Sequence, residues 1–163
     1  MIIERYRRWF EYEKDAHAKV LASFETVPVD RRSCAEYRKA VAIMAHIVGA
    51  RRIWLYRMGA IATAPALFPE NPELTKVVDD WRETQALWEK FLASQTDQEI
   101  EQTFEYKSLD AGRFRNRIED ILTQLFGHSS YHRGQIAMLI RAAGGEPAIT
   151  DLIFWCREAA KEA

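Results

Sequence analysis

The 163-residue chain has the composition of an ordinary globular protein: 48% of its residues are hydrophobic, 29% are charged and the formal net charge is -1. This balance excludes the strongly basic surface that nucleic-acid binding requires, so we expect no nucleic-acid partner. The two cysteines, Cys34 and Cys156, are too few for a disulfide framework or a cysteine zinc site, which favours a cytoplasmic protein.

No targeting or membrane-spanning segment is evident. Charges begin at Glu4, so the apolar core of a secretory leader is missing. The most apolar run, residues 41–50, is far shorter than the ~20 residues that span a bilayer. We therefore expect a soluble protein with no membrane partner. The arginine pairs at 7–8, 31–32 and 51–52 stand near acidic residues and are interpreted as solvated helix faces.

The first half of the chain has the three- and four-residue spacing of apolar side chains that is typical of helices. It predicts one helix over residues 3–24 and a second from Ser33 or Cys34 to Met58. Ser33 and Glu36 stand at capping-box spacing at the start of the second helix. A proline-rich loop follows, and a third helix is predicted over residues 73–93.

The second half begins with a short segment of strand character, residues 102–116, in which Asp110-Ala111-Gly112 is a turn signal. This pattern predicts an extended excursion, with room for one small hairpin. A fourth long helix is predicted over residues 116–143, ending at Gly144-Gly145, and a short helix closes the chain. Four long helices favour an all-α, four-helix bundle formed by a single domain, residues 1–163.

Two of the four histidines, His128 and His132, stand four residues apart on the fourth helix. They share one stripe with apolar residues and with Gln135, so we expect both to be buried on successive turns. His46 lies on a similar stripe of the second helix, where Gly49 and Ala50 are small enough to leave a cavity.

Three imidazoles that converge in an apolar interior indicate a divalent metal site. A buried neutral imidazole has one donor and one acceptor nitrogen to satisfy, and a metal takes the lone pair while the other nitrogen finds an acceptor. Three protein ligands leave a coordination position open, which is the catalytic arrangement. The alternative stays open, because a lone core histidine such as His46 is more often a packing residue than a ligand.

The segment "HSSYHRGQIAMLIRAAGGEPAITDLIFW" resembles the C-terminal signature of the DinB-like superfamily. "AHIVGARRIWLYRM" is similar to the second-helix motif of that family, and "FEYKSLDAG" to its extended excursion before the last helix. The three motifs fall in the family's order and cover essentially the whole chain. One departure is Gly127, where family members often carry asparagine as a neighbour of the metal ligands.

The resemblance implies an up-down-down-up four-helix bundle in which His46, His128 and His132 bind a divalent metal, zinc or nickel. It also implies a homodimer, for which the exposed aromatics Trp9 and Trp155 are candidates. We expect a small-molecule substrate. The catalytic residues and any cofactor-binding residues beyond the metal ligands are not specified by the sequence.

Three functions are compatible with such a site. The first is a metal-dependent hydrolase, the family's usual assignment. A bound zinc ion lowers the pKa of water toward ~7 and so supplies a hydroxide nucleophile. The histidine motifs, however, contain no evident general base. Relatives that use a low-molecular-weight thiol suggest an S-transferase or isomerase, since a metal ionises a coordinated thiol without a protein base. The third is a non-catalytic metal-binding bundle of the stress response.

Other residues near the motifs have less specific interpretations. His17, in line with Phe10 on the first helix, is either a fourth ligand or proton relay, or an ordinary hydrogen-bonded or surface histidine. Gln135 shares the histidine stripe and can support a ligand, whereas Arg133 points elsewhere and is expected to pair with an acid. Tyr131 is expected to be a packing residue.

Overall fold

The computed structural model describes residues 1–108 and 112–158, and within these ranges the chain is mostly helical. The elements are the long helices α1 (Ile2–Phe24), α2 (Ala35–Arg57), α3 (Leu74–Ser94) and α5 (Ile118–Ala142), the short helices η1 (Val29–Arg31), α4 (Asp97–Ile100) and α6 (Leu152–Cys156), and the strands β1 (Thr103–Lys107) and β2 (Arg113–Arg117). The predicted all-α class is confirmed. No helix in the described ranges is long and apolar enough to cross a membrane.

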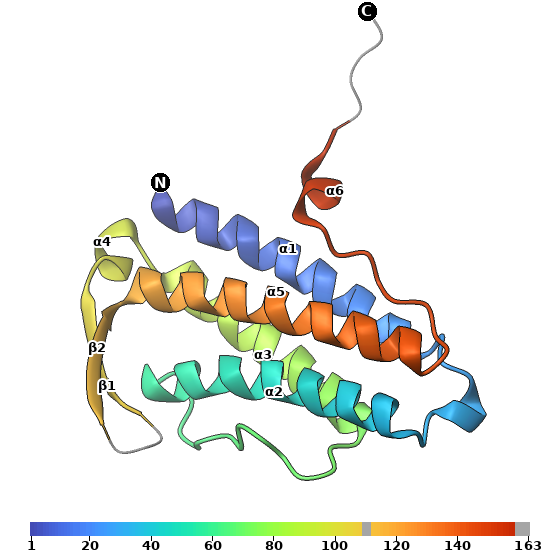
Figure 1. Cartoon of the computed structure of the whole chain (residues 1–163). Coiled ribbons are helices and arrows are strands. Elements are labelled where there is room, and N and C mark those ends of the chain that lie inside the picture. Colours follow the sequence, from blue (N-terminus) through green and yellow to red (C-terminus); the bar gives the residue numbers. More distant parts are fainter. Residues whose placement is uncertain (109–111, 159–163) are drawn as a thin grey trace, which may run out of the picture.

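The four long helices pack against one another. Helix α1 contacts α3 and α5, and α2 contacts the same two helices. Figure 1 shows that α1 and α5 run in one direction while α2 and α3 run in the other. The closest association is between α2 and α5, the two helices that carry the predicted metal ligands.

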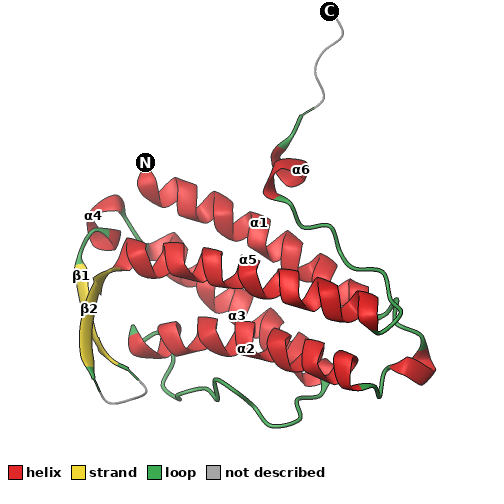
Figure 2. Ribbon diagram, in the orientation of Figure 1, coloured by secondary structure: helices red, strands yellow, loops and turns green. Residues whose placement is uncertain are grey.

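Strands β1 and β2 form one antiparallel hairpin between α4 and α5 (Figure 2). Thr103 pairs with Arg117 at one end and Lys107 with Arg113 at the other. The predicted excursion is therefore confirmed as a hairpin. The predicted turn at 110–112 falls largely on residues 109–111, which lie outside the described residues.

The helix ends differ from the prediction at the start of α2. Its N-cap is Cys34 and makes no side-chain hydrogen bond, so the predicted capping box of Ser33 and Glu36 is wrong. A complete capping box occurs instead at α4, a helix that the sequence analysis missed, where Thr96 and Glu99 satisfy each other's backbone amides. The predicted end of the last long helix is confirmed by Gly144, whose φ of 89° suits glycine.

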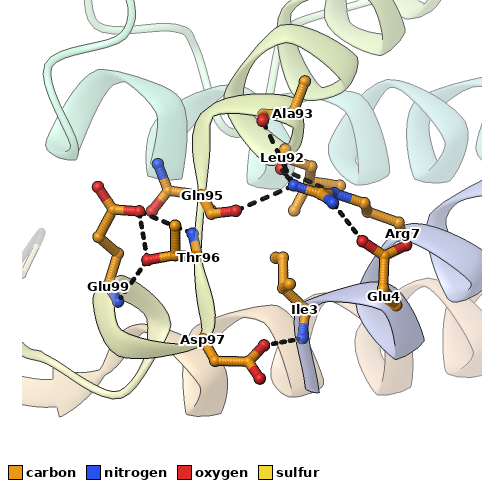
Figure 3. Close-up of polar contacts among 9 residues, drawn as sticks. All are labelled: Ile3, Glu4, Arg7, Leu92, Ala93, Gln95, Thr96, Asp97 and Glu99. Carbon is orange, nitrogen blue, oxygen red and sulfur yellow. Dashed lines mark hydrogen bonds and ion pairs between the residues drawn. The ribbon is translucent and has the colours of Figure 1, made fainter. Parts of the chain in front are cut away.

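The start of α1 is tied to the connection between α3 and α4 (Figure 3). The backbone amide of Ile3 donates to Asp97 Oδ1 at 2.8 Å, and Arg7 Nη2 donates to the carbonyls of Leu92 and Gln95 at 3.0 and 2.9 Å. These bonds satisfy a free amide at the first turn of α1 and carbonyls at the end of α3.

The core contains two separate apolar clusters with polar side chains between them. One cluster includes Phe24 and Ile140, and the other includes Phe10 and Trp88. On each long helix, buried polar residues fall between the members of the two clusters. We call these seven residues the polar layer: Glu13, His17, Arg51, Thr84, Gln85, Ser129 and Arg133.

Candidate metal centre

Three histidines from two helices converge on one point. His46 projects from α2, and His128 and His132 project from successive turns of α5. The Nε2 atom of His128 lies 3.1 Å from Nε2 of His46 and 3.1 Å from Nε2 of His132. Potential ligand atoms of all three lie within 4.8 Å of one another, and among the described residues no carboxylate or thiol joins this group.

The outer nitrogens of two of these rings have oxygen partners. Nδ1 of His46 lies 3.1 Å from the carbonyl oxygen of Leu67, and Nδ1 of His132 lies 2.7 Å from Oε1 of Gln135. Both partners are acceptors, so the neutral form of each ring carries its proton on Nδ1 and has a lone pair on Nε2. Gln135 therefore contacts a ligand candidate, as its place on the histidine stripe suggested, and its support of a metal ligand stays a prediction.

The donor set fits a cation. His128 Nε2 carries at most one proton and can hydrogen-bond to only one of its two neighbours, so at least one of the two 3.1 Å Nε2 contacts has no hydrogen bond unless a cation lies between the rings. Metal–nitrogen bonds of about 2.0–2.1 Å place neighbouring ligand nitrogens about 3.3 Å apart in a tetrahedron and about 2.9 Å apart in an octahedron. The observed Nε2 separations of 3.1 Å fall between these values.

The loop between α2 and α3 reaches the site because Gly49 lets it approach. A Cβ atom at Gly49 would lie 2.8 Å from the carbonyl oxygen of Ala66 and 3.3 Å from Cα of Leu67. Loop backbone therefore fills the space directly against Gly49, and the hollow that Gly49 lines lies between α2, this loop and the start of α3, with none of the three histidines in its wall. The same loop stacks the ring of Phe68 on His46, with centroids 4.6 Å apart and planes 6° apart.

The three ligand candidates are half-buried, whereas we expected them to be fully buried. Burial is the largest cause that lowers the pKa of His128, to about 4, followed by His132, His46 and Arg51. Burial also lowers the pKa of His46, although the Leu67 carbonyl opposes this shift. Both rings are consequently neutral at pH 7, the form that binds a metal.

The face of α5 that is buried explains why the histidines are only half-buried. The stripe that faces the core runs through Leu125, Ser129, Arg133 and Ile136, one position along from the stripe that we predicted. The histidines therefore lie on the flank of α5 that faces α2. Tyr131, expected to be a packing residue, is 66% exposed and makes an edge contact with the ring of His132 at 5.1 Å between centroids.

Behind the histidines, the polar layer contains a buried ion network. Glu13 accepts from Arg133 Nη1 at 2.7 Å and pairs with Arg51 through its other oxygen, and all three side chains are at most 4% exposed. Arg133 Nη2 also donates to the Tyr12 hydroxyl at 2.9 Å. The expected acid partner of Arg133 is thus confirmed, whereas the interpretation of Arg51 as a solvated residue is wrong.

The sequence did contain a signal for this network. Glu13 stands three residues after Phe10 and four before His17, on the apolar stripe of α1, and Arg133 stands four residues after Ser129. The sequence analysis did not single out Glu13, because charged side chains are rarely buried. Its position on the apolar stripe of α1 was the better guide.

His17 is completely buried and does not join the three-histidine group. Neither ring nitrogen has a hydrogen-bond partner among the described residues, so neither the expected ligand nor the expected hydrogen-bonded or surface histidine is found. Burial, followed by the charge of Arg133, lowers its pKa to about 3, and the ring is neutral at pH 7.

The fold and the site together make this a helical protein with a candidate metal centre, formed by three histidines between two of its helices. The model of the DinB family matches residues 4–162, nearly the whole chain. The chain therefore belongs to the DinB family, as its motifs suggested. No curated protein and no solved structure matched it.

Proposed function

We propose that His46, His128 and His132 bind one divalent metal ion, zinc or nickel, in a four-helix bundle of up-down-down-up topology formed by a single domain. The observation that carries this proposal is the hydrogen bonding of the outer nitrogens. Leu67 and Gln135 fix the tautomers of two rings so that their Nε2 lone pairs face Nε2 of His128. Three neutral imidazoles leave further coordination positions for water or substrate.

A divalent ion in this site would lower the pKa of a coordinated water or thiol and so supply a nucleophile at neutral pH. The chain's own part is to hold three neutral ligands and to leave one side accessible. On this basis we propose a metal-dependent enzyme that acts on a small molecule, with hydrolysis as the first reaction class.

Transfer of a low-molecular-weight thiol is the second candidate, and one observation favours it. Among the described residues, the histidine group includes no carboxylate to serve as a general base beside the ligands, and the buried Glu13 is engaged by two arginines. A thiol has a pKa of about 8.5, against about 15.7 for water, so it needs no such base.

Two aromatic side chains are suited to contact a substrate at the open side. Phe68 is 73% exposed and stacks on His46, and Tyr131 is 66% exposed beside His132. Exposed aromatic surface of this kind is typical of sites that bind the apolar part of a ligand. We infer that these residues orient the substrate, while the metal acts on its reactive group.

The metal site is tested by elemental analysis of protein purified without a histidine tag. We expect one ion per chain in the wild type and in Gln124→Ala, an exposed position one turn before His128. His128→Ala should lose the ion while retaining its helical circular dichroism. A folded wild type that binds no zinc, nickel or cobalt would refute the site and both enzymatic proposals.

The two reaction classes are separated with cobalt-loaded protein. Adding mycothiol, bacillithiol or glutathione should produce sulfur-to-metal charge-transfer absorption if the protein is a thiol transferase. If no thiol gives this absorption and the loaded protein hydrolyses a member of an ester and amide panel, hydrolysis is supported. A bound ion with neither response identifies the non-catalytic alternative.

We also propose a cytoplasmic homodimer. Trp9 and Trp155, our first candidates for the contact, are half-buried and pack on Phe126 and Tyr12 respectively. Support comes instead from exposed apolar residues on α5 and in the C-terminal segment, which are Met138, Ile149, Ile153 and Phe154. Sedimentation that detects only monomer at micromolar concentrations would contradict the dimer.

A further inference from the structure

The hairpin of β1 and β2 has one strand on the bundle and one strand beyond it. Phe104 and Tyr106 of β1 are half-buried, and Tyr106 makes an edge contact with Trp54 of α2 at 4.8 Å between ring centroids. All five residues of β2 are exposed, and even Phe114, which shares a face of the sheet with Tyr106, is 51% exposed. Strand β1 therefore anchors the hairpin, whereas β2 is the outer strand, at the end of the bundle where α4 lies (Figure 1).

The free edge of β2 presents the backbone of three arginines. The described residues form a sheet of two strands only, so β2 has a neighbouring strand on one side. At the two ends of the hairpin the amide of Ser108 donates to the carbonyl of Gly112 at 2.8 Å, and the amide of Ile118 donates to the carbonyl of Gln102 at 3.1 Å. Hydrogen-bonded and non-hydrogen-bonded pairs alternate along an antiparallel ladder. The residues of β2 that turn their backbone groups away from β1 are therefore Arg113, Arg115 and Arg117.

Two of these outward amides are open to a partner strand. The amide of Arg117 already donates to Asp120 Oδ2 at 3.2 Å. The amides of Arg113 and Arg115 have no hydrogen-bond partner in the part of the chain that the structure describes. An edge of this kind can pair with an extended segment, which adds one more strand to the sheet.

The side chains of the same arginines make this edge basic. They share the outer face of the hairpin with the residues opposite them in β1, which are Lys107, Glu105 and Thr103. The two strands contain four positive side chains and one negative one, a net charge of +3 in a chain whose formal net charge is -1. Arg113 pairs with Glu105 at 3.4 Å. Arg117 pairs with Glu119 of α5 at 3.0 Å, whereas Arg115 has no acidic partner among the described residues.

Charge selects the strand that can be added. A second copy of β2 would place arginine beside arginine, and like charges opposite each other in adjacent strands are destabilising. Carboxylates at every second position of an added strand would instead lie opposite the arginines, and an apolar side chain would suit the place beside Phe114 on the other face. We propose that β2 binds an extended segment of a partner protein in which acidic residues alternate with apolar ones. This surface contains none of the three histidines and is separate from the metal centre.

The direct test is amide hydrogen exchange measured by NMR. The probe is a peptide of about eight residues in which glutamate alternates with valine, a length that covers β2. In the saturated protein, exchange of the Arg113 and Arg115 amides should slow by about tenfold or more, because both amides become hydrogen-bonded. A peptide of the same composition with its glutamates in one block should not slow them. Unchanged exchange with the alternating peptide, or equal slowing by the block peptide, would overturn the proposal.

A second test separates backbone pairing from charge. Arg115→Ala and Arg115→Pro lose the same charge, but proline also removes the outward amide, and it leaves the bonds to β1 intact because that amide is not part of the ladder. The dissociation constant of the alternating peptide should rise by up to about fivefold in Arg115→Ala, and by about fivefold or more beyond that in Arg115→Pro. Lys90→Ala, which removes an exposed charge of α3, should bind as the wild type does.

Two results of this second test would overturn the proposal. Equal affinity of the alanine and proline variants would show that the backbone edge is not used. Tighter binding of an oligouridylate of the same charge than of the peptide would show that the hairpin is a site for nucleic acid. If Arg115→Pro loses the hairpin, amide exchange in the wild type decides.

Discussion

Gly49→Ala should weaken metal binding without touching a ligand. The new Cβ would lie 2.8 Å from the Ala66 carbonyl oxygen, where ordinary contacts begin at 3.4 Å, so the loop backbone must retreat by about 0.6 Å. A retreat of this size lengthens the bond between His46 Nδ1 and the Leu67 carbonyl from 3.1 Å to as much as about 3.7 Å, which is too long for a hydrogen bond.

Losing such an outer hydrogen bond lowers metal affinity by about 10- to 100-fold, or about 1.4–2.7 kcal/mol. The affinity is measured by titrating zinc into metal-free protein against a competing chelator. The matched control is Gly127→Ala, next to His128, because a Cβ there would meet nothing within 4 Å among the described residues. This control should bind zinc as the wild type does and gain about 0.5–1 kcal/mol in stability. Equal zinc affinity in Gly49→Ala and the wild type would refute the role of the loop.

Three further predictions concern the polar layer and the ligand support. Glu13→Gln leaves two buried guanidinium groups without a counter-charge and should lower the free energy of unfolding, measured in urea, by about 3–5 kcal/mol. The control Glu11→Gln, at an exposed position, should change this free energy by no more than about 0.5 kcal/mol. A small effect in both variants would show that the network is dispensable. His17 has a pKa of about 3 when folded and 6.5 when unfolded, so the unfolded state binds more protons between these values and stability falls as pH falls. From pH 7 to 5 the metal-free wild type should lose about 2 kcal/mol more than His17→Gln, and parallel pH profiles would contradict this. Gln135→Ala removes the acceptor of His132 Nδ1 and should weaken zinc binding about tenfold or more by calorimetry; unchanged binding would show that this amide has no supporting role.

The helices and the histidine cluster were predictable because they depend on local spacing. Apolar residues at three- and four-residue steps locate each long helix to within a few residues. Any two residues four positions apart on a helix share a face, so His128 and His132 were expected side by side. His46 required more, since its approach to the pair depends on how α2 packs on α5. The family motif supplied that information, and the structure brings the three rings together.

The burial of charge and the path of the loop were not predictable from spacing alone. The rule that charged residues face solvent placed Arg51 outside, because one sequence stripe does not reveal an acid on another helix. Glu13 lies 38 residues away from Arg51 along the chain, and only the packed helices bring them together. Likewise, Gly49 suggested open space, while the loop that occupies it comes from a segment with no regular secondary structure.

Helix α5 is held on two neighbouring faces, by Arg133 in its pair with Glu13 of α1 and by His128 and His132 against α2. Turning α5 about its own axis, or sliding it by one turn of about 5.4 Å, would separate the arginine from its carboxylate. The orientation of the imidazoles is thereby determined when the chain folds, before any ion arrives. Little reorganisation remains for the binding step, so a cation should enter at a rate set by access to the histidines and not by movement of the helix.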